Sequence, residues 1–105
     1  MADFMKILQQ AQQMQGRIQQ MQEELEHQTV TATAGGGMVT VDADGKGTVK
    51  RVKIDAAVVN PTDVEMLEDL VLVAVTEAQK KAAALAQEEM GKLAGGLPLP
   101  FKMPF

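Results

Sequence analysis

An unbroken apolar stripe runs through the first 28 residues and commits them to a helix. Its members recur at steps of three and four, and the positions between them are mostly glutamine. This period is typical of a helix that packs along another helix. The pattern predicts a helix over residues 3–26. Gly16 in its middle is either a tolerated outward-facing glycine or a point where a partner approaches or the helix bends. The stripe consists of Phe4, Ile7, Ala11, Met14, Ile18, Met21 and Leu25.

The middle of the chain has the residues of a β-meander. Gly35-Gly36-Gly37 separates two segments rich in β-branched residues, and Asp44-Gly45 indicates a hairpin before a third. Strict alternation fails in the third segment, so we expect a bulge or strong twist near Lys50-Arg51. An antiparallel sheet is predicted, with strands over residues 28–34, 38–43 and 48–55.

A second long helix is predicted over residues 63–93. Thr62 and Glu65 have the spacing of a capping box at its start. Leu70–Val75 is apolar all round, so we expect it to be enclosed on every side. The alanine-rich stretch that follows is thin enough for the first helix to approach closely. Together these elements predict an α+β protein with an α-β-β-β-α protomer, a single domain over residues 1–94 and a flexible Gly/Pro-rich tail over residues 95–105.

The apolar residues available for a core favour assembly of the chain into an oligomer. The only aromatic residues are three phenylalanines, so the core must be built from smaller side chains. A domain of this size buries a low fraction of its surface. Both arguments predict a homodimer. The candidates for its interface and core are Leu67, Leu70, Val71, Leu72, Val73 and Val75.

The residue types needed for most catalysis are missing. The chain has no cysteine and no serine, and His27 is its only histidine. A lone histidine in the last turn of a helix suits the helix dipole better than catalysis. We therefore predict no enzyme activity, no catalytic residue, no metal and no cofactor. No apolar run approaches the roughly 20 residues of a membrane span, so we expect no membrane association.

The basic residues are the remaining polar feature of interest. The net charge of −4 counts against a nucleic-acid partner, because such proteins usually carry a basic footprint. Two-fold symmetry would double each basic patch, however, and paired patches contact phosphates without reading bases. The hairpin candidates, selected by charge clustering, are Lys46, Lys50, Arg51 and Lys53.

Three ordered blocks carry a resemblance that covers nearly the whole chain. They are GGGMVTVDADGKGTVKRVKID, VEMLEDLVLVAV and EEMGKLAGGLPLP. They look like the YbaB/EbfC family of bacterial nucleoid-associated proteins. The resemblance implies a tweezer-like homodimer, in the cytoplasm and nucleoid, whose helical arms straddle double-stranded DNA. The resemblance also implies that the helical arms contact DNA through Lys6, Arg17, Lys80 and Lys81.

Two functions follow as expectations. The first is a dimeric nucleoid-associated protein that binds duplex DNA mainly through the backbone, alters its conformation and influences nucleoid organisation and gene expression. The alternative is a protein–protein adaptor or chaperone-like clamp without significant DNA affinity, because methionine surfaces adapt easily to apolar partners. The methionines proposed for that clamp are Met5, Met14, Met21 and Met90.

Overall fold

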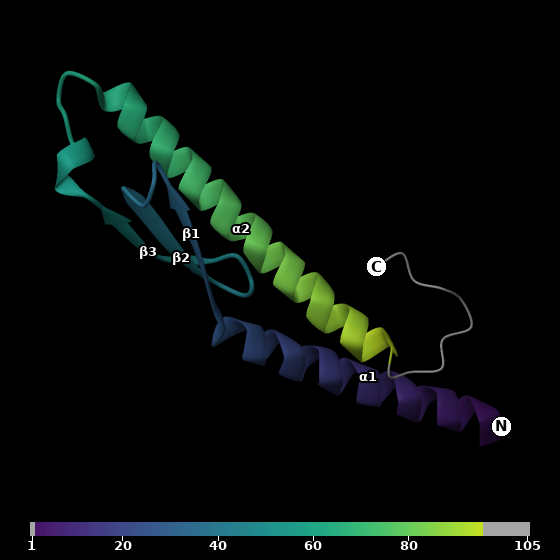
Figure 1. Ribbon diagram of the computed structural model, residues 1–105. Coiled ribbons are helices and arrows are strands. Elements are labelled where there is room, and N and C mark those ends of the chain that lie inside the picture. The colour runs from purple at the N-terminus through teal and green to yellow at the C-terminus, as the bar shows by residue number, and fades with distance from the viewer. Residues whose placement is uncertain (1, 96–105) are drawn as a thin grey trace.

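The computed structural model describes residues 2–95 and shows an α-β-β-β-α chain (Figure 1). The predicted element order and meander are confirmed, and the tail prediction lies outside the described residues apart from Gly95. A short 3-10 helix, η1, precedes the last helix. The elements are α1 (Ala2–Glu26), β1 (Thr29–Ala34), β2 (Val39–Asp44), β3 (Val49–Ile54), η1 (Ala56–Val58) and α2 (Val64–Gly95).

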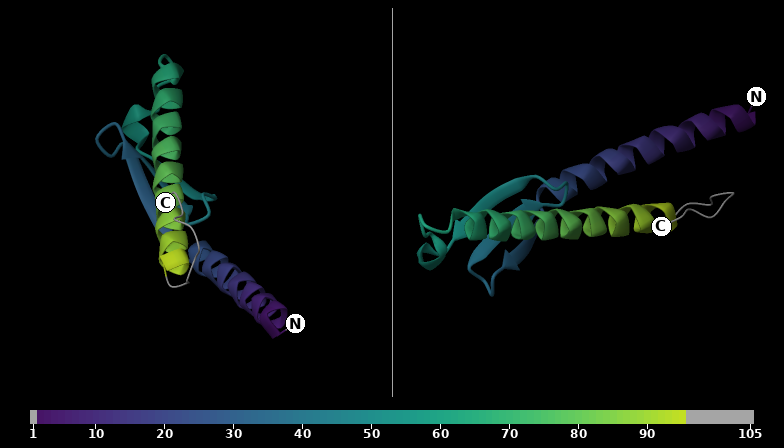
Figure 2. Two further views of the ribbon diagram at one scale, coloured as in Figure 1. Left: turned by 90° about the vertical axis from the view of Figure 1, so that its right-hand side faces the viewer. Right: turned by 90° about the horizontal axis from the view of Figure 1, so that it is seen from above.

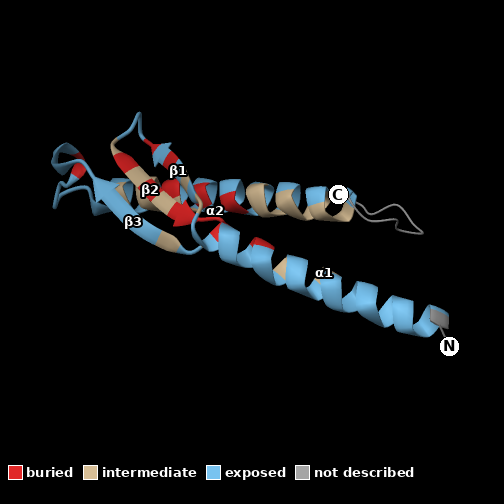
Figure 3. Ribbon diagram, turned by 90° about the horizontal axis from the view of Figure 1, so that it is seen from below, coloured by how far each residue is buried: buried red, intermediate tan, exposed pale blue. Residues whose placement is uncertain are grey.

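The sheet is an antiparallel meander with the order β1-β2-β3. Ala32 pairs with Val41 and Ala34 pairs with Val39, and all four side chains are buried. The intervening threonines of β1 are exposed on the opposite face. This period-2 alternation gives the sheet one apolar face, which α2 covers, and one open polar face (Figure 3).

The core between α2 and the sheet is small. Ala74 and Ala78 of α2 meet the buried alanines and valines of β1 and β2. These alanines bring the helix backbone close to the sheet. The helix contacts β1 and β2 extensively, so the apolar side chains of β3 on the same sheet face are left uncovered. Val52 and Ile54 remain exposed for this reason.

The expected bulge is present at Lys50. Asp42 pairs with Arg51, whereas the next residue, Ala43, pairs with Val49. Lys50 is therefore the extra residue of β3. The irregular apolar spacing of this segment of the sequence is the consequence of this insertion.

The predicted capping box at the start of α2 is wrong. The helix begins at Val64, and the Oδ1 atom of Asp63 accepts a hydrogen bond from the N–H of Met66 at 3.3 Å. Asp63 is thus the capping residue. Thr62 instead donates its backbone N–H and its hydroxyl to Oδ1 of Asn60, which organises the preceding turn.

A single copy of the chain encloses only part of Leu70–Val75. Ala74 is fully buried, but Leu72 is 65% exposed and Val73 is 50% exposed. The physical reason is that α2 rests on the sheet with one face. The expectation of enclosure on every side is therefore not met within one protomer.

The α1 stripe is covered along only part of its length. Met21 and Leu25 are buried, whereas Phe4 and Ile7 are exposed. The view in Figure 3 shows the same change along α1, from buried positions beside the sheet to exposed positions toward its N-terminus. The molecule is consequently elongated, with extents of 72 × 23 × 16 Å.

Candidate nucleic-acid interface

The open face of the sheet carries two exposed cations. Arg51 and Lys53 alternate along β3 with Val52, so both lie on the face opposite α2. Their partners on β2 are Asp42 and Thr40. The Oδ1 atom of Asp42 accepts a hydrogen bond from the Thr31 hydroxyl at 2.8 Å, which ties the carboxylate to β1. The result is a threonine-rich surface with two cations on its third strand.

The turn between β2 and β3 is organised by the buried carboxylate of Asp44. Its Oδ1 atom accepts hydrogen bonds from the N–H of Lys46 at 2.9 Å and of Thr48 at 3.0 Å. Its Oδ2 atom lies 3.7 Å from Nζ of Lys50. Burial alone would raise the pKa of Asp44. The hydrogen bonds from Thr48 and Lys46, with the nearby ammonium groups of Lys50 and Lys46, outweigh burial and lower the pKa overall.

The hairpin lysines are therefore engaged within the protein. Lys50 pairs with Asp44, and Nζ of Lys46 lies 3.0 Å from Oε1 of Glu26 at the end of α1. The second pair joins the hairpin to the first helix. Exposed pairs of this kind contribute little stability, so a phosphate can compete for the Lys46 ammonium at modest cost.

The two adjacent lysines of α2 differ in their contacts. Nζ of Lys80 lies 3.6 Å from Oε1 of Glu77 on the same helix. Nζ of Lys81 instead donates to the backbone carbonyl of Thr31 at 2.7 Å. Lys81 thus links α2 to the outer edge of the sheet, and its side chain has a structural contact that its sequence position did not reveal.

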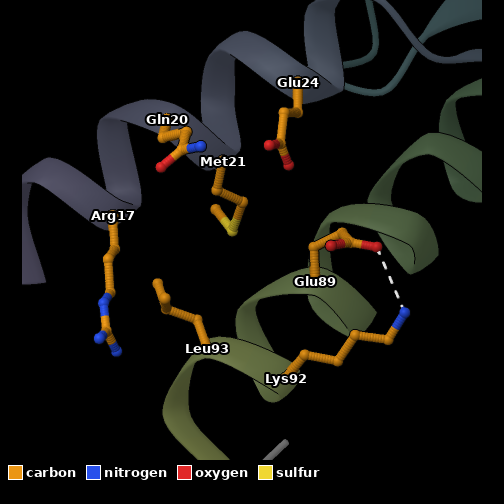
Figure 4. A pocket seen from close by; sticks show the side chains of 7 residues that line it. All are labelled: Arg17, Gln20, Met21, Glu24, Glu89, Lys92 and Leu93. Atoms are coloured by element: carbon orange, nitrogen blue, oxygen red, sulfur yellow. Dashed lines mark ion pairs between the residues drawn. The ribbon is translucent and has the colours of Figure 1, made fainter. Parts of the chain in front are cut away.

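Of the two candidate cations on α1, Arg17 borders a cavity between α1 and the last turns of α2 (Figure 4). The same cavity contains Lys92, which sequence reasoning missed. Nζ of Lys92 lies 3.5 Å from Oε1 of Glu89 and 3.7 Å from Oε1 of Glu88. Its position in the last turn of α2 is an ordinary one for a lysine, so no sequence signal marked it. The lining residues are Arg17, Gln20, Met21, Glu24, Glu89, Lys92 and Leu93.

The structure does not gather the candidate cations into one patch. They divide among the open sheet face, the hairpin, α1 and α2. Among the described residues, four of the eight form no ion pair and no side-chain hydrogen bond with a protein group: Lys6, Arg17, Arg51 and Lys53.

Comparisons with known proteins agree with this architecture. The chain matches the YbaB/EbfC DNA-binding family over residues 1–97. It is 60% identical over 103 residues to a nucleoid-associated protein of Gemmatimonas aurantiaca, covering 98% of this chain and 99% of that protein. It is 55% identical over 101 residues to a nucleoid-associated protein of Thermodesulfovibrio yellowstonii, covering 96% of this chain and 85% of that protein.

A solved structure shares the fold. The crystal structure of an uncharacterized protein from Helicobacter pylori superposes with a TM-score of 0.72 at 24% identity, covering 89% of this chain and 94% of that chain. The architecture and the relatives define the class, that of bacterial nucleoid-associated proteins. Within this class, the chain belongs to the YbaB/EbfC DNA-binding family, and the resemblance drawn from the sequence is confirmed. No helix in residues 2–95 is long and apolar enough to cross a membrane.

Proposed function

We propose that this protein acts as a homodimer that binds duplex DNA through its phosphates, alters the conformation of the DNA and thereby contributes to nucleoid organisation and gene expression. Membership of a DNA-binding family supports DNA as the binding partner. The role requires no catalytic step and no cofactor. Direct contacts with phosphates fix a protein on DNA without carrying sequence information, so we expect little sequence preference.

The observation that carries the proposal is the set of four exposed cations that have no carboxylate partner within residues 2–95. Lys6 and Arg17 lie on α1, and Arg51 and Lys53 lie on the open sheet face. Cations that no carboxylate neutralises are available to displace counterions from DNA, which is the main source of sequence-independent affinity. The paired lysines on the hairpin and on α2 would add contacts by exchanging a carboxylate for a phosphate.

The homodimer is supported by an uncovered apolar surface. Val52 and Ile54 lie on the α2 side of β3 yet stay exposed. Gln79 of α2 donates to the carbonyl of Gly47 at 3.2 Å, so this side of the helix faces the β2–β3 turn. Leu72 is seven residues earlier and lies on the same side. A second copy would cover Leu72, Val52 and Ile54 together, and the two sets of helices would then flank the duplex.

The test is a salt-titrated gel shift with a short random duplex. Three double variants each remove two positive charges: Lys6→Gln with Arg17→Gln, Arg51→Gln with Lys53→Gln, and Lys80→Gln with Lys81→Gln. A fourth variant, Ala84→Glu with Gln87→Glu, changes the net charge equally at two exposed positions of α2 and serves as the control.

Binding should weaken steeply as the salt concentration rises. Removing one cation that neutralises a phosphate should reduce the slope of log affinity against log salt by about 0.9. The α1 and sheet variants should therefore show weaker binding and a shallower salt dependence than the control. Salt-insensitive binding, or equal effects in all four variants, would overturn the proposal of binding through phosphates.

One observation favours the alternative of a protein adaptor. Met21 and Met90 both line a second cavity, between α1, the β2–β3 turn and α2, together with Leu25 and Ala86. Such a surface suits an apolar segment of another protein. Lys80→Glu with Lys81→Glu separates the two functions, because charge reversal on α2 should weaken DNA binding and leave binding of an apolar partner largely intact. No gel shift even at low salt would favour the adaptor.

A further inference from the structure

The apolar stripe of α1 is covered at one end and open at the other. Leu25 is 3% exposed and Met21 is 7% exposed, where α1 packs against α2. Phe4 and Ile7, toward the N-terminus, are each 62% exposed. Figures 1 and 2 show this part of α1 projecting past the last turn of α2 and away from it. The apolar pattern therefore continues along a part of the helix that α2 does not cover.

The uncovered part of the stripe has the pattern of a coiled-coil seam. Its members recur at steps of three, four and three, which are the steps between the a and d positions of a heptad. They are Phe4, Ile7, Ala11 and Met14. Such a seam requires a facing helix whose side chains fit between its own. Phe4, Ile7 and Ala11 are exposed, so no other element of residues 2–95 supplies that helix.

We propose that residues 4–14 of α1 pair with the same residues of a second copy as an antiparallel coiled coil, whose two-fold axis passes beside Gln9. The symmetry then places Phe4 against the partner's Met14. It places Ile7 against the partner's Ala11. Each layer of the seam joins a larger side chain to a smaller one, and this combination fills the space between two helices without crowding.

The residues beside the seam fit this orientation. In the same register, Asp3 lies beside the partner's Arg17, and the symmetry repeats this pair of opposite charges at the other end. Leu8, which is exposed in a single chain, meets the partner's Leu8 at the two-fold axis. Charges at such flanking positions set the orientation of a coiled coil. Arg17 forms no ion pair within residues 2–95, so its guanidinium is free for this contact.

A parallel pair fits the same residues less well. It would place Phe4 against the partner's Phe4 and Ala11 against the partner's Ala11, so one layer would be crowded and another would contain a gap. Asp3 would lie beside the partner's Leu8 and would gain no cation. The side chains of the seam and of its flanks therefore both favour the antiparallel arrangement.

The geometry of the pair makes it a contact between dimers. With the axis beside Gln9, the Leu25 residues of the two chains lie about 48 Å apart along the pair, at a rise of about 1.5 Å per residue. The two bodies therefore lie at opposite ends, so the same two chains cannot also share the surface of Leu72, Val52 and Ile54. The linkage of dimers rests on the homodimer proposed above, whereas the pairing of the arms does not.

The first test is sedimentation velocity of the full chain without DNA. A seam of two heptads forms a small interface, so assemblies larger than the dimer should appear as the protein concentration rises. Ile7→Asp places a charge in the seam and should weaken this association at least ten-fold. Gln9→Asp places the same charge about 200° around the helix and should leave it unchanged.

The outcome also separates the arm contact from the body contact. If the body does not dimerise, the arms alone give a dimer that Ile7→Asp removes and Leu72→Asp does not. Equal assembly of Ile7→Asp and Gln9→Asp, or a wild type without any species that Ile7→Asp removes, would overturn the pairing of the arms.

A second test is disulfide formation between chains, since the protein contains no cysteine of its own. Leu8→Cys places two thiols together at the two-fold axis. Under mild oxidation it should crosslink several-fold faster than Gln9→Cys, in which the thiol lies on the outer face. Faster crosslinking of Phe4→Cys than of Leu8→Cys would indicate a parallel pair and would overturn the antiparallel register.

A third test exchanges the flanking charges. Asp3→Arg or Arg17→Asp alone brings like charges together across the pair and should weaken the association several-fold. The variant with both substitutions restores opposite charges and should recover the association of the wild type. A double variant as weak as the single variants would show that these residues do not meet. None of these measurements uses DNA, so their failure is distinct from a failure of the gel shift.

Discussion

At the scale of single residues, Asp44 does the most to organise the hairpin. Its carboxylate is buried and holds the turn through two backbone N–H groups and a lysine. Gly45 follows it at a place where a Cβ atom would lie 2.7 Å from the carbonyl oxygen of Leu25. The Asp-Gly pair therefore has two roles. Asp44 holds the turn, and Gly45 allows the end of α1 to approach the turn closely.

Replacing Asp44 by asparagine should reduce stability at neutral pH, because the substitution removes the charge that accepts these hydrogen bonds. The pKa of Asp44 is lowered in the folded protein. The ionised carboxylate therefore contributes to the free energy of unfolding above the unfolded-state pKa of about 3.9. This contribution is lost as the pH falls through the folded-state pKa. Urea unfolding of both proteins at pH 7 and in acid measures this difference.

The gap between wild type and Asp44→Asn should narrow as the pH drops below about 3.9. Asp69→Asn, on the exposed surface of α2, is the control and should change stability little. A gap that stays constant with pH would show that the charge of Asp44 has no role in stability.

At the scale of elements, α1 is a long helix that packs against the rest of the protein over only a small part of its length. Its packing rests on Met21 and Leu25 near its end, with Met14 and Ile18 contributing less. Most of the helix is exposed to solvent, so its intrinsic propensity matters more than it would in a buried helix. Gly16 is the weakest position by this criterion.

Gly16→Ala should stabilise the helix by about 1 kcal/mol. A Cβ atom added at Gly16 would meet nothing within 4 Å, and its backbone has no positive φ. Far-ultraviolet circular dichroism during urea unfolding measures the gain in helicity and stability. Gly91→Ala in α2 is a second open glycine for comparison. A loss of stability or of assembly in Gly16→Ala would instead favour close approach of a partner at this point.

At the scale of the whole molecule, β3 leaves apolar side chains uncovered on the sheet face that α2 occupies. Val52 and Ile54 are exposed in a single copy of the chain and would form part of a core if a partner packed on them. Leu72 extends this surface onto the helix. Monomeric proteins rarely expose large apolar patches, which is why we propose that a second copy covers these residues.

Leu72→Asp should weaken the dimer by about 30-fold or more, because it places a charge in the centre of the proposed interface. Sedimentation velocity over a range of micromolar concentrations measures the shift toward monomer. Gln87→Asp, on the exposed outer side of α2 beyond the body, introduces the same charge and should leave the dimer intact. A monomeric wild type, or a Leu72→Asp variant as dimeric as the control, would contradict the interface.

Much of the fold was predictable because its determinants lie close together in the chain. The 3.5-residue period of α1, the alternation of β1 and β2, and the turn at Asp44-Gly45 all express backbone preferences of neighbouring residues. Even the bulge at Lys50 could be expected from the broken alternation. The cap of α2 was predicted one residue too early, because Thr62 and Asp63 are both good capping residues and only the geometry of the turn at Asn60 separates them.

The sequence by itself determined the order of the elements, the apolar face of each and the family to which the chain belongs. Only the tertiary structure decided which lysines are paired, that α2 covers β1 and β2 but not β3, and that α2 ends before the α1 stripe does. The physical reason is that these features depend on where segments far apart in the chain meet. A pattern in one segment cannot reveal whether a carboxylate such as Glu26 will lie beside Lys46, or how far one helix will cover another.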